Sequence, residues 1–147
     1  MKNRFETFTV LIASINRSIY RIKTEEMAEF NLKSSHVSCL YYLYKEKALT
    51  SKELCVLCGE DKSNISRALK YLEENGYIAY EPSEKKRYNR LLELSSKGLD
   101  TGKKIAEKID NILESASIGL SEEDRLTMYR GLSLISNNLN KVCDENN

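Results

Sequence analysis

The clearest signals of the fold lie in residues 49–78, LTSKELCVLCGEDKSNISRALKYLEENGYI. Thr50 is followed by Glu53 at the spacing of a capping box, which predicts the start of a short helix. Gly59 can end that helix, because glycine readily adopts the left-handed conformation of a helix C-cap. The expected apolar side of this helix consists of Leu54, Leu57 and Cys58.

A second helix is predicted over residues 62–75, with Asp61 as its N-cap and Asn75-Gly76 as its stop. Its apolar residues recur every three or four positions and so form one stripe for burial. That stripe consists of Ile65, Ala68, Leu69 and Leu72. Two short helices separated by a turn that contains glycine are typical of a helix-turn-helix.

The periodicity changes after Gly76. Residues 77–80 and 90–94 are rich in aromatic and aliphatic side chains, which predicts two short strands. The polar turn PSEKKRYN at 82–89 joins them into a hairpin. Residues 82–90 hold four basic residues against one acidic residue, so this hairpin has a basic tip. On a chain with a net charge of +1, such a tip favours contact with a polyanion at one place; the alternative is a solvated loop.

Amphipathic helices are predicted on both sides of this region. The N-terminal helix has an unbroken seam of apolar residues at alternating spacings of three and four, which is typical of helix-on-helix packing. The seam consists of Phe5, Phe8, Ile12, Ile15, Ile19 and Ile22. A contact between subunits is the favoured interpretation of this seam, and a core helix of a monomer is the alternative.

Three further helices complete the prediction. The helix over residues 33–47 has an apolar face of Val37, Leu40, Tyr41 and Tyr44. A long helix that begins at Ser95 or Ser96 directs inward the residues Ile105, Ile109, Ile112, Leu113 and Ala116. Gly119 breaks it, and Ser121 caps a last helix whose apolar residues are Leu126, Tyr129, Leu132, Ile135, Leu139 and Val142. The expected fold is a single domain, mainly α, with a small β-hairpin after the helix-turn-helix.

Composition excludes several classes of protein. The 147 residues are 41% hydrophobic and 31% charged, as in folded globular domains. No stretch approaches the roughly 20 apolar residues of a membrane helix, and the N-terminus lacks the apolar run of a signal peptide. Four cysteines are too sparse for a disulfide scaffold, so we expect a reduced, cytoplasmic protein. A single histidine and the lack of phosphate-loop, G-x-S-x-G and H-E-x-x-H motifs argue against an enzyme.

The outer face of the 62–75 helix is polar and basic. It consists of Lys62, Ser63, Asn64, Ser66, Arg67 and Lys70. Side chains of these types reach base edges and phosphates in the major groove of DNA. The alternative is a helix that is only solvated on its outer side. The adjacent basic hairpin favours nucleic-acid binding, because a helix and a neighbouring wing can reach successive grooves.

From Leu49 to Gly98 the sequence resembles the MarR family of winged-helix transcription factors. The stretch at 49–78 is similar to that family's short helix, turn, recognition helix and first wing strand without a gap, and ELSSKG at 93–98 stands where the family has L-T-x-x-G. The resemblance extends more loosely over the whole chain. It implies a winged helix-turn-helix DNA-binding part at residues 33–95, flanked by dimerisation helices at residues 1–32 and 96–147.

The resemblance implies a transcriptional regulator, expected to be a repressor, that binds double-stranded DNA as a homodimer on an inverted repeat and needs no cofactor. The groove-facing positions carried over from the family are Ser63, Asn64, Ser66 and Arg67. The wing arginine is Arg87, and the basic residues Lys85, Lys86 and Arg90 surround it. The implied dimer contacts are Phe5, Phe8, Ile12, Ile15, Ile19, Tyr129, Leu132, Ile135 and Leu139. One departure concerns the acid that the family commonly has two residues before the wing arginine: this chain has Lys85 there, with Glu84 as a candidate replacement.

Members of the family often release DNA when a phenolic ligand binds or a cysteine is oxidised. The resemblance therefore implies a small phenolic or other apolar effector. For Cys55 and Cys58, core packing is the favoured interpretation, and a thiol-responsive or metal-responsive regulator is the alternative. Structural zinc takes four ligands, for which the further candidates are Cys39, Cys143 and His36, and we expect no metal site. Two more functions stay open, a winged helix used for protein–protein contact and a DNA-binding protein without an effector.

Overall fold

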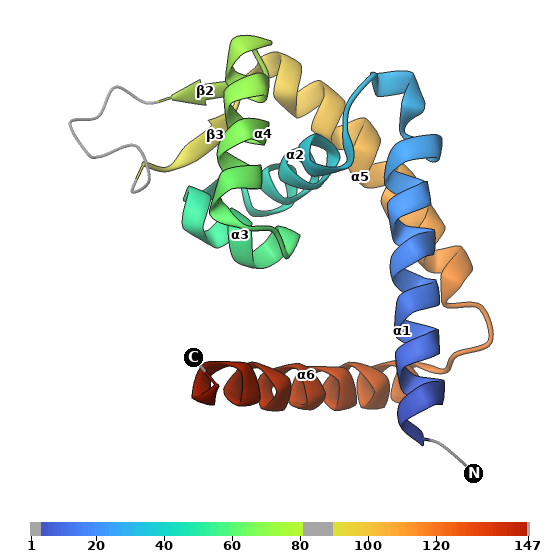
Figure 1. The fold of residues 1–147 in the computed structure, drawn as a ribbon. Coiled ribbons are helices and arrows are strands. Elements are labelled where there is room, and N and C mark those ends of the chain that lie inside the picture. The colour runs from blue at the N-terminus through green and yellow to red at the C-terminus, as the bar shows by residue number, and fades with distance from the viewer. Residues whose placement is uncertain (1–3, 81–89, 147) are drawn as a thin grey trace. The chain divides into compact units, whose positions relative to one another are not determined.

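The computed structural model describes residues 4–80 and 90–146 of the chain (Figure 1). It comprises two compact units, residues 1–108 and residues 109–147. Its helices and small antiparallel sheet confirm the predicted fold class. Within the described ranges, no helix is long and apolar enough to cross a membrane. The predicted division of the chain into dimerisation and DNA-binding parts stays a prediction.

Helix α3 spans Ser51–Cys58 and begins at the predicted capping box. The Thr50 hydroxyl accepts a hydrogen bond from the backbone N–H of Glu53, and the Glu53 carboxylate accepts one from the backbone N–H of Thr50 at 2.8 Å. Gly59 ends the helix with φ at 63°, in the left-handed region. Of the predicted apolar side, Leu54 is buried, whereas Leu57 and Cys58 are only partly covered.

Helix α4 spans Lys62–Glu74, and Asp61 caps it by accepting from the backbone N–H of Asn64 at 2.8 Å. The predicted stripe of Ile65, Ala68, Leu69 and Leu72 is buried in full. Gly76 follows the helix with φ at 78°. These observations confirm the second helix of the helix-turn-helix together with both of its ends.

Helix α2 spans Ser34–Glu46 and contacts α3, α4 and strand β3. Val37 and Leu40 are buried as predicted, but Tyr41 and Tyr44 are only half-buried. Because neighbours cover this helix over a wide arc, the buried set also takes in Cys39 and Leu43, which the predicted apolar face did not include. Tyrosines suit the edge of such an arc, where the ring is covered and the hydroxyl reaches water.

The core of residues 1–108 gathers side chains from most of its elements. The largest side chains with almost no exposed surface are Met27, Leu40, Leu43, Leu54, Ile65, Leu72, Leu92 and Ile105. Met27 lies in the corner between α1 and α2, where no helical periodicity marks it as a core residue.

The sheet has three antiparallel strands in the order β1-β3-β2. β2 (Ile78–Tyr80) and β3 (Leu92–Leu94) are the predicted hairpin strands, and they pair with Ala79 opposite Glu93. β1 (Ala48–Leu49) was not predicted. Two residues are too short to show an alternating pattern, so only the pairing of β1 with β3 defines it as a strand.

Helix α5 spans Ser96–Ala116. Hydrogen bonds connect the residue before it to the segment that follows α4. The backbone N–H of Ser95 donates to the Tyr77 carbonyl at 3.0 Å, and the Ser95 hydroxyl donates to the Gly76 carbonyl. Gly98 packs so closely here that a Cβ at this position would lie 2.0 Å from the Tyr77 carbonyl oxygen. Close approach of two backbones therefore explains the glycine in ELSSKG.

Helix α1 spans Arg4–Arg21 and continues into a π-helical turn η1 (Ile22–Glu26) and a 3-10 turn η2 (Ala28–Phe30). Lys108 of α5 holds this corner: its Nζ donates to the Glu26 carbonyl at 2.7 Å and pairs with the Glu29 carboxylate. The corner therefore fixes the end of the N-terminal segment to α5.

The unit of residues 109–147 contains the end of α5 and the helix α6 (Glu122–Glu145). Ser121 caps α6 as predicted, with a capping box to Asp124. Ile109 and Ile112 are half-buried, but Leu113 and Ala116 are exposed, so their predicted inward placement was wrong. A unit this short cannot enclose a core of its own.

Candidate nucleic-acid interface

The outer face of α4 lies opposite its buried stripe and carries six of the predicted DNA-binding residues. Lys62, Ser63, Ser66, Arg67 and Lys70 are exposed, and Asn64 is half-buried. Helix α4 contacts strand β2 of the wing, as can be followed in Figure 1. The fold therefore presents a polar, basic helix surface beside the predicted hairpin.

Hydrogen bonds link three side chains at the start of this face. The Glu60 carboxylate accepts from Asn64 Nδ2 at 3.0 Å. The Arg67 guanidinium donates to Asn64 Oδ1. Glu60 was not among the predicted site residues. It stands four residues before Asn64, a spacing at which side chains on a helix can interact, and this spacing is the sequence signal that could have identified it.

Lys70 lies farther along the same face. Its Nζ is 3.9 Å from the Glu74 carboxylate, and both side chains are more than 60% exposed. Exposed pairs of this kind contribute about 0–1 kcal/mol, so water and a phosphate can both compete for the Lys70 ammonium.

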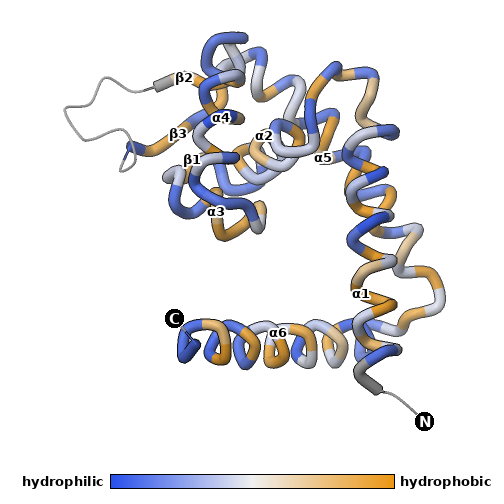
Figure 2. The backbone as a smooth tube through the Cα atoms, in the orientation of Figure 1, coloured by the Kyte–Doolittle hydropathy of each residue, from blue (hydrophilic) through white to orange (hydrophobic). Residues whose placement is uncertain are grey.

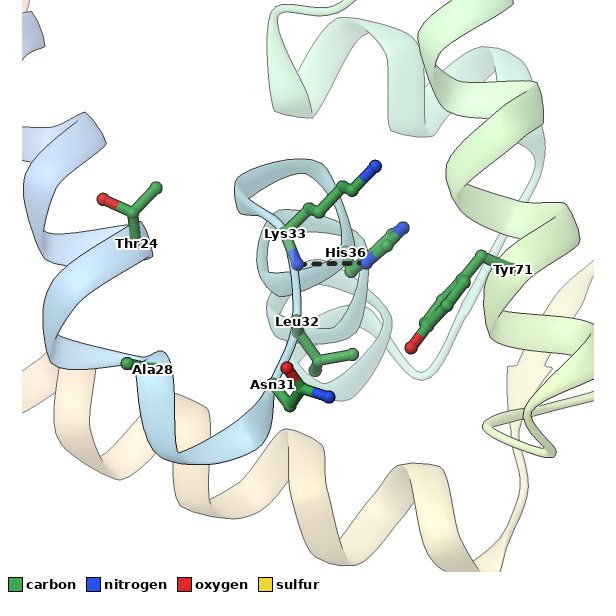
Figure 3. Close-up of a pocket in the computed structure, with 7 residues that line it drawn as sticks. All are labelled: Thr24, Ala28, Asn31, Leu32, Lys33, His36 and Tyr71. Carbon is green, nitrogen blue, oxygen red and sulfur yellow. Dashed lines mark hydrogen bonds between the residues drawn. The ribbon is translucent and has the colours of Figure 1, made fainter.

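A cavity of about 400 Å³ borders α4 at Tyr71 (Figure 3). Its lining residues come from the η1–η2 corner, the start of α2 and the middle of α4; they are Thr24, Ala28, Asn31, Leu32, Lys33, His36 and Tyr71. One wall is therefore part of the same helix that carries the basic face.

His36 connects α2 to α4 in this cavity. Its ring stacks on Tyr71 with the centroids 4.2 Å apart and the planes 7° from parallel. His36 Nδ1 accepts from the backbone N–H of Lys33 at 3.1 Å, as Figure 3 shows. Burial, and to a lesser degree the Lys33 charge, lowers the pKa of His36. The neutral ring therefore holds the start of α2, and only 5% of the residue is exposed.

Comparisons with known proteins identify the family. The MarR family model matches residues 30–87. The helix-turn-helix-type transcriptional regulator YwoH of Bacillus subtilis is 30% identical over 118 residues, which cover 78% of this chain and 85% of YwoH. The chain belongs to the MarR family. It is a DNA-binding transcriptional regulator and not an enzyme.

Solved structures of MarR proteins share the fold. The regulator NMB1585 of Neisseria meningitidis matches with a TM-score of 0.86 and 19% identity, over 99% of each chain. A MarR family regulator from Listeria monocytogenes in complex with a 26-mer DNA matches with a TM-score of 0.77 and 24% identity, over 87% of this chain and 85% of the other. At these identities the likeness shows the fold alone. DNA binding by the family favours the nucleic-acid interpretation of α4 over a module for protein–protein contact.

The wing of this MarR protein is only partly described. Lys85, Lys86 and Arg87 lie outside the described residues, as does Glu84, so the predicted replacement of the wing acid stays a prediction. Arg90 is half-buried two residues before β3 begins at Leu92.

The cysteines have different surroundings. Cys39 is buried, Cys55 and Cys58 are half-buried, and Cys143 is exposed. A hydrogen bond from the Cys39 thiol lowers the pKa of Cys58, and the same bond, together with burial, raises the pKa of Cys39. Cys58 therefore interacts by a hydrogen bond with Cys39 of α2, and not with Cys55 of its own C-x-x-C motif. Among residues 4–80 and 90–146, no group of three or more His, Cys, Asp or Glu could hold a metal ion.

The predicted dimer contacts retain exposed apolar surface. Phe8 and Ile12 are half-buried in α1, while 52% of Ile15 and 42% of Ile19 is exposed. The α6 residues are exposed by between 38% and 54%; they are Tyr129, Leu132, Ile135 and Leu139. The side chain of Phe5 lies outside what the structure describes.

Proposed function

We propose that this MarR-family regulator is a sequence-specific repressor that acts as a homodimer on an inverted-repeat operator and is released by a small-molecule effector. The observation that carries the proposal is the outer face of α4, where arginine, lysine, asparagine and serine side chains stand opposite a stripe buried in the core. A helix anchored in this way can enter a major groove without losing its packing.

The sequence specificity is assigned to Arg67. Its forked guanidinium can donate to O6 and N7 of guanine from the exposed face of α4. Arg87 of the wing is assigned to minor-groove charge and phosphates. The wing therefore adds affinity for any DNA, and α4 adds discrimination between sequences.

The experiment compares Arg67→Ala and Arg87→Ala on operator and scrambled DNA as the salt concentration rises. The operator is first obtained by sequencing DNA that co-purifies with the protein at low salt. Arg67→Ala should weaken operator binding by about 1–3 kcal/mol with little change on scrambled DNA. Arg87→Ala should weaken both DNAs and reduce the salt dependence by roughly one counterion per subunit. If the two variants exchange these effects, the assignment of roles is reversed.

The homodimer is supported by the apolar faces of α1 and α6. An uncovered seam of this kind is an unusually large apolar patch for a monomer. The two-fold symmetry of a dimer would require an inverted operator with half-sites about one helical turn apart. The proposed cytoplasmic location follows from the DNA target.

The effector site is assigned to the cavity beside Tyr71. Its aromatic wall and the nearby Lys33 suit a small phenol or another compact apolar ligand. A ligand that displaces the ring of His36 from Tyr71 would act directly on α4. A panel of phenols should release operator DNA, and Tyr71→Ala should alter the concentration required; a panel without effect on the wild type would argue for a regulator without a phenolic effector.

A thiol response is the second candidate function, favoured by the lowered pKa of Cys58. The test adds peroxide or zinc to the wild type and to a variant in which Cys55 and Cys58 are both alanine. If the cysteines serve packing, the variant loses stability and neither protein responds. Release of DNA from the wild type alone would establish the thiol response.

A further inference from the structure

Glu60 is an acidic residue directly before a helix whose outer face is basic. Its backbone N–H donates to the Cys55 carbonyl at 3.1 Å, as part of the cap that ends α3. Its carboxylate accepts from Asn64 Nδ2 at 3.0 Å. The main chain and the side chain of Glu60 are therefore both held, and the fold sets the position of its charge.

Asn64 uses both ends of its side-chain amide. Its Nδ2 donates to Glu60, and its Oδ1 accepts from Arg67. A carboxylate can only accept and a guanidinium can only donate, so the amide has one orientation between them. The two ends that would form a bidentate contact with adenine thus each make one hydrogen bond within the protein, which fixes the plane of the amide beside Arg67.

Arg67 benefits from this link because a long, exposed side chain loses conformational freedom when it docks on a base. Holding the guanidinium in advance reduces that loss. A negative charge close to the DNA surface has the opposite effect on general affinity, because it repels phosphates.

We propose that Glu60 and Asn64 are positioning residues that hold the Arg67 guanidinium for base recognition, with Glu60 lowering affinity for DNA of any sequence. The proposal rests on the proposed function, in which Arg67 reads a base. It assigns to Asn64 a link between Glu60 and Arg67 instead of a direct base contact.

The test separates charge from positioning with two variants of Glu60. Glu60→Gln removes the charge but keeps an oxygen that accepts from Asn64, whereas Glu60→Ala removes both. Both variants should bind scrambled DNA more tightly than the wild type and to the same degree. Only Glu60→Ala should lower the ratio of operator to scrambled affinity, by about two- to tenfold, the range expected for ordering one long side chain.

Asn64→Ala removes the middle of the same link and should lower the ratio of operator to scrambled affinity by a similar factor. Glu74→Ala is the matched control, because it removes an acid of the same helix that pairs with Lys70 and not with Asn64. It should leave the ratio unchanged. Thermal unfolding of each variant shows whether the fold is retained.

A double-mutant cycle with Arg67→Ala gives the decisive result. Once Arg67 is absent, Glu60→Ala should no longer change the ratio. Equal loss in both backgrounds, equal loss in Glu60→Gln, or no loss in Glu60→Ala would overturn the positioning role. If Arg67→Ala itself leaves the ratio unchanged, base recognition by Arg67 and this inference fail together; if it lowers the ratio and Glu60→Ala does not, only the inference fails.

Discussion

Helices α4 and α6 begin with the same kind of N-cap, but their apolar faces differ in burial. Asp61 caps α4 and Ser121 caps α6. Each helix has apolar residues at helical spacing. The stripe of α4 is buried within residues 1–108, whereas the apolar residues of α6 stay exposed, and Figure 2 shows hydrophobic and hydrophilic segments alternating along that helix.

An amphipathic pattern therefore predicts that one face of a helix is buried, but it does not identify the molecule that buries it. In α4, the chain itself covers the apolar face and leaves exposed the polar face that we assign to DNA. In α6, we assign the cover to a second copy of the chain. A helix covered within the chain and a helix covered by a partner should respond differently to substitution.

The largest effect is expected from charges in the α1 seam. Replacing Ile12 and Ile15 together with Asp should abolish the dimer and tight operator binding, because two carboxylates would have to be buried in the interface. Sedimentation should show a monomer that retains its helical circular dichroism. A wild-type chain that is monomeric at micromolar concentration would contradict the role given to the terminal helices.

A paired truncation compares α4 with α6 directly. Leu72 is completely buried, so Leu72→Ala should lower the free energy of unfolding by about 2–5 kcal/mol. Leu139 is 54% exposed, so Leu139→Ala should instead weaken the dimer, and raising the protein concentration should stabilise this variant less than it stabilises the wild type. Denaturant unfolding at two protein concentrations distinguishes the two effects, and an equal, concentration-independent loss in both variants would erase the contrast.

Two glycines give a smaller comparison of the same kind. Gly98→Ala should destabilise the fold by about 1–3 kcal/mol, because its Cβ would meet the Tyr77 carbonyl. Gly131 of α6 has open space around it, so Gly131→Ala should stabilise the helix by about 0.5–1 kcal/mol. Thermal unfolding measures both, and a destabilised Gly131→Ala would show that the partner helix packs against this position.

The smallest effect is the pH dependence contributed by His36. Its pKa is lowered in the folded chain by burial and by Lys33, while the unfolded value is near the ordinary 6.5. The stabilisation is therefore fully present above about pH 6.5 and is lost as the pH falls from there through the lower folded pKa. His36→Gln keeps a capping side chain at this helix position without titrating, so it should flatten the stability profile below pH 6.5. An unchanged profile would assign the acid sensitivity to other groups.

Signals that act within a few residues were readable from the sequence. The capping box of Thr50 and Glu53, the Asp61 and Ser121 caps, and the glycine at position 59 were all predicted and confirmed. So was the buried stripe of α4. In each case, the groups that interact are neighbours along the chain, or lie on one face of one helix, and their spacing alone specifies the structure.

Contacts between distant segments were decided only by the tertiary structure. Strand β1 exists because β3 pairs with it. The wide burial of α2 exists because elements on several sides of it contact it, among them α3, α4 and β3. Two side-chain contacts also join separate helices. His36 of α2 stacks on Tyr71 of α4, and Cys39 of α2 forms a hydrogen bond with Cys58 of α3. Sequence periodicity describes the faces of one element at a time, so it cannot say which faces pack against each other. In this protein that packing decides which side of α4 stays exposed to solvent.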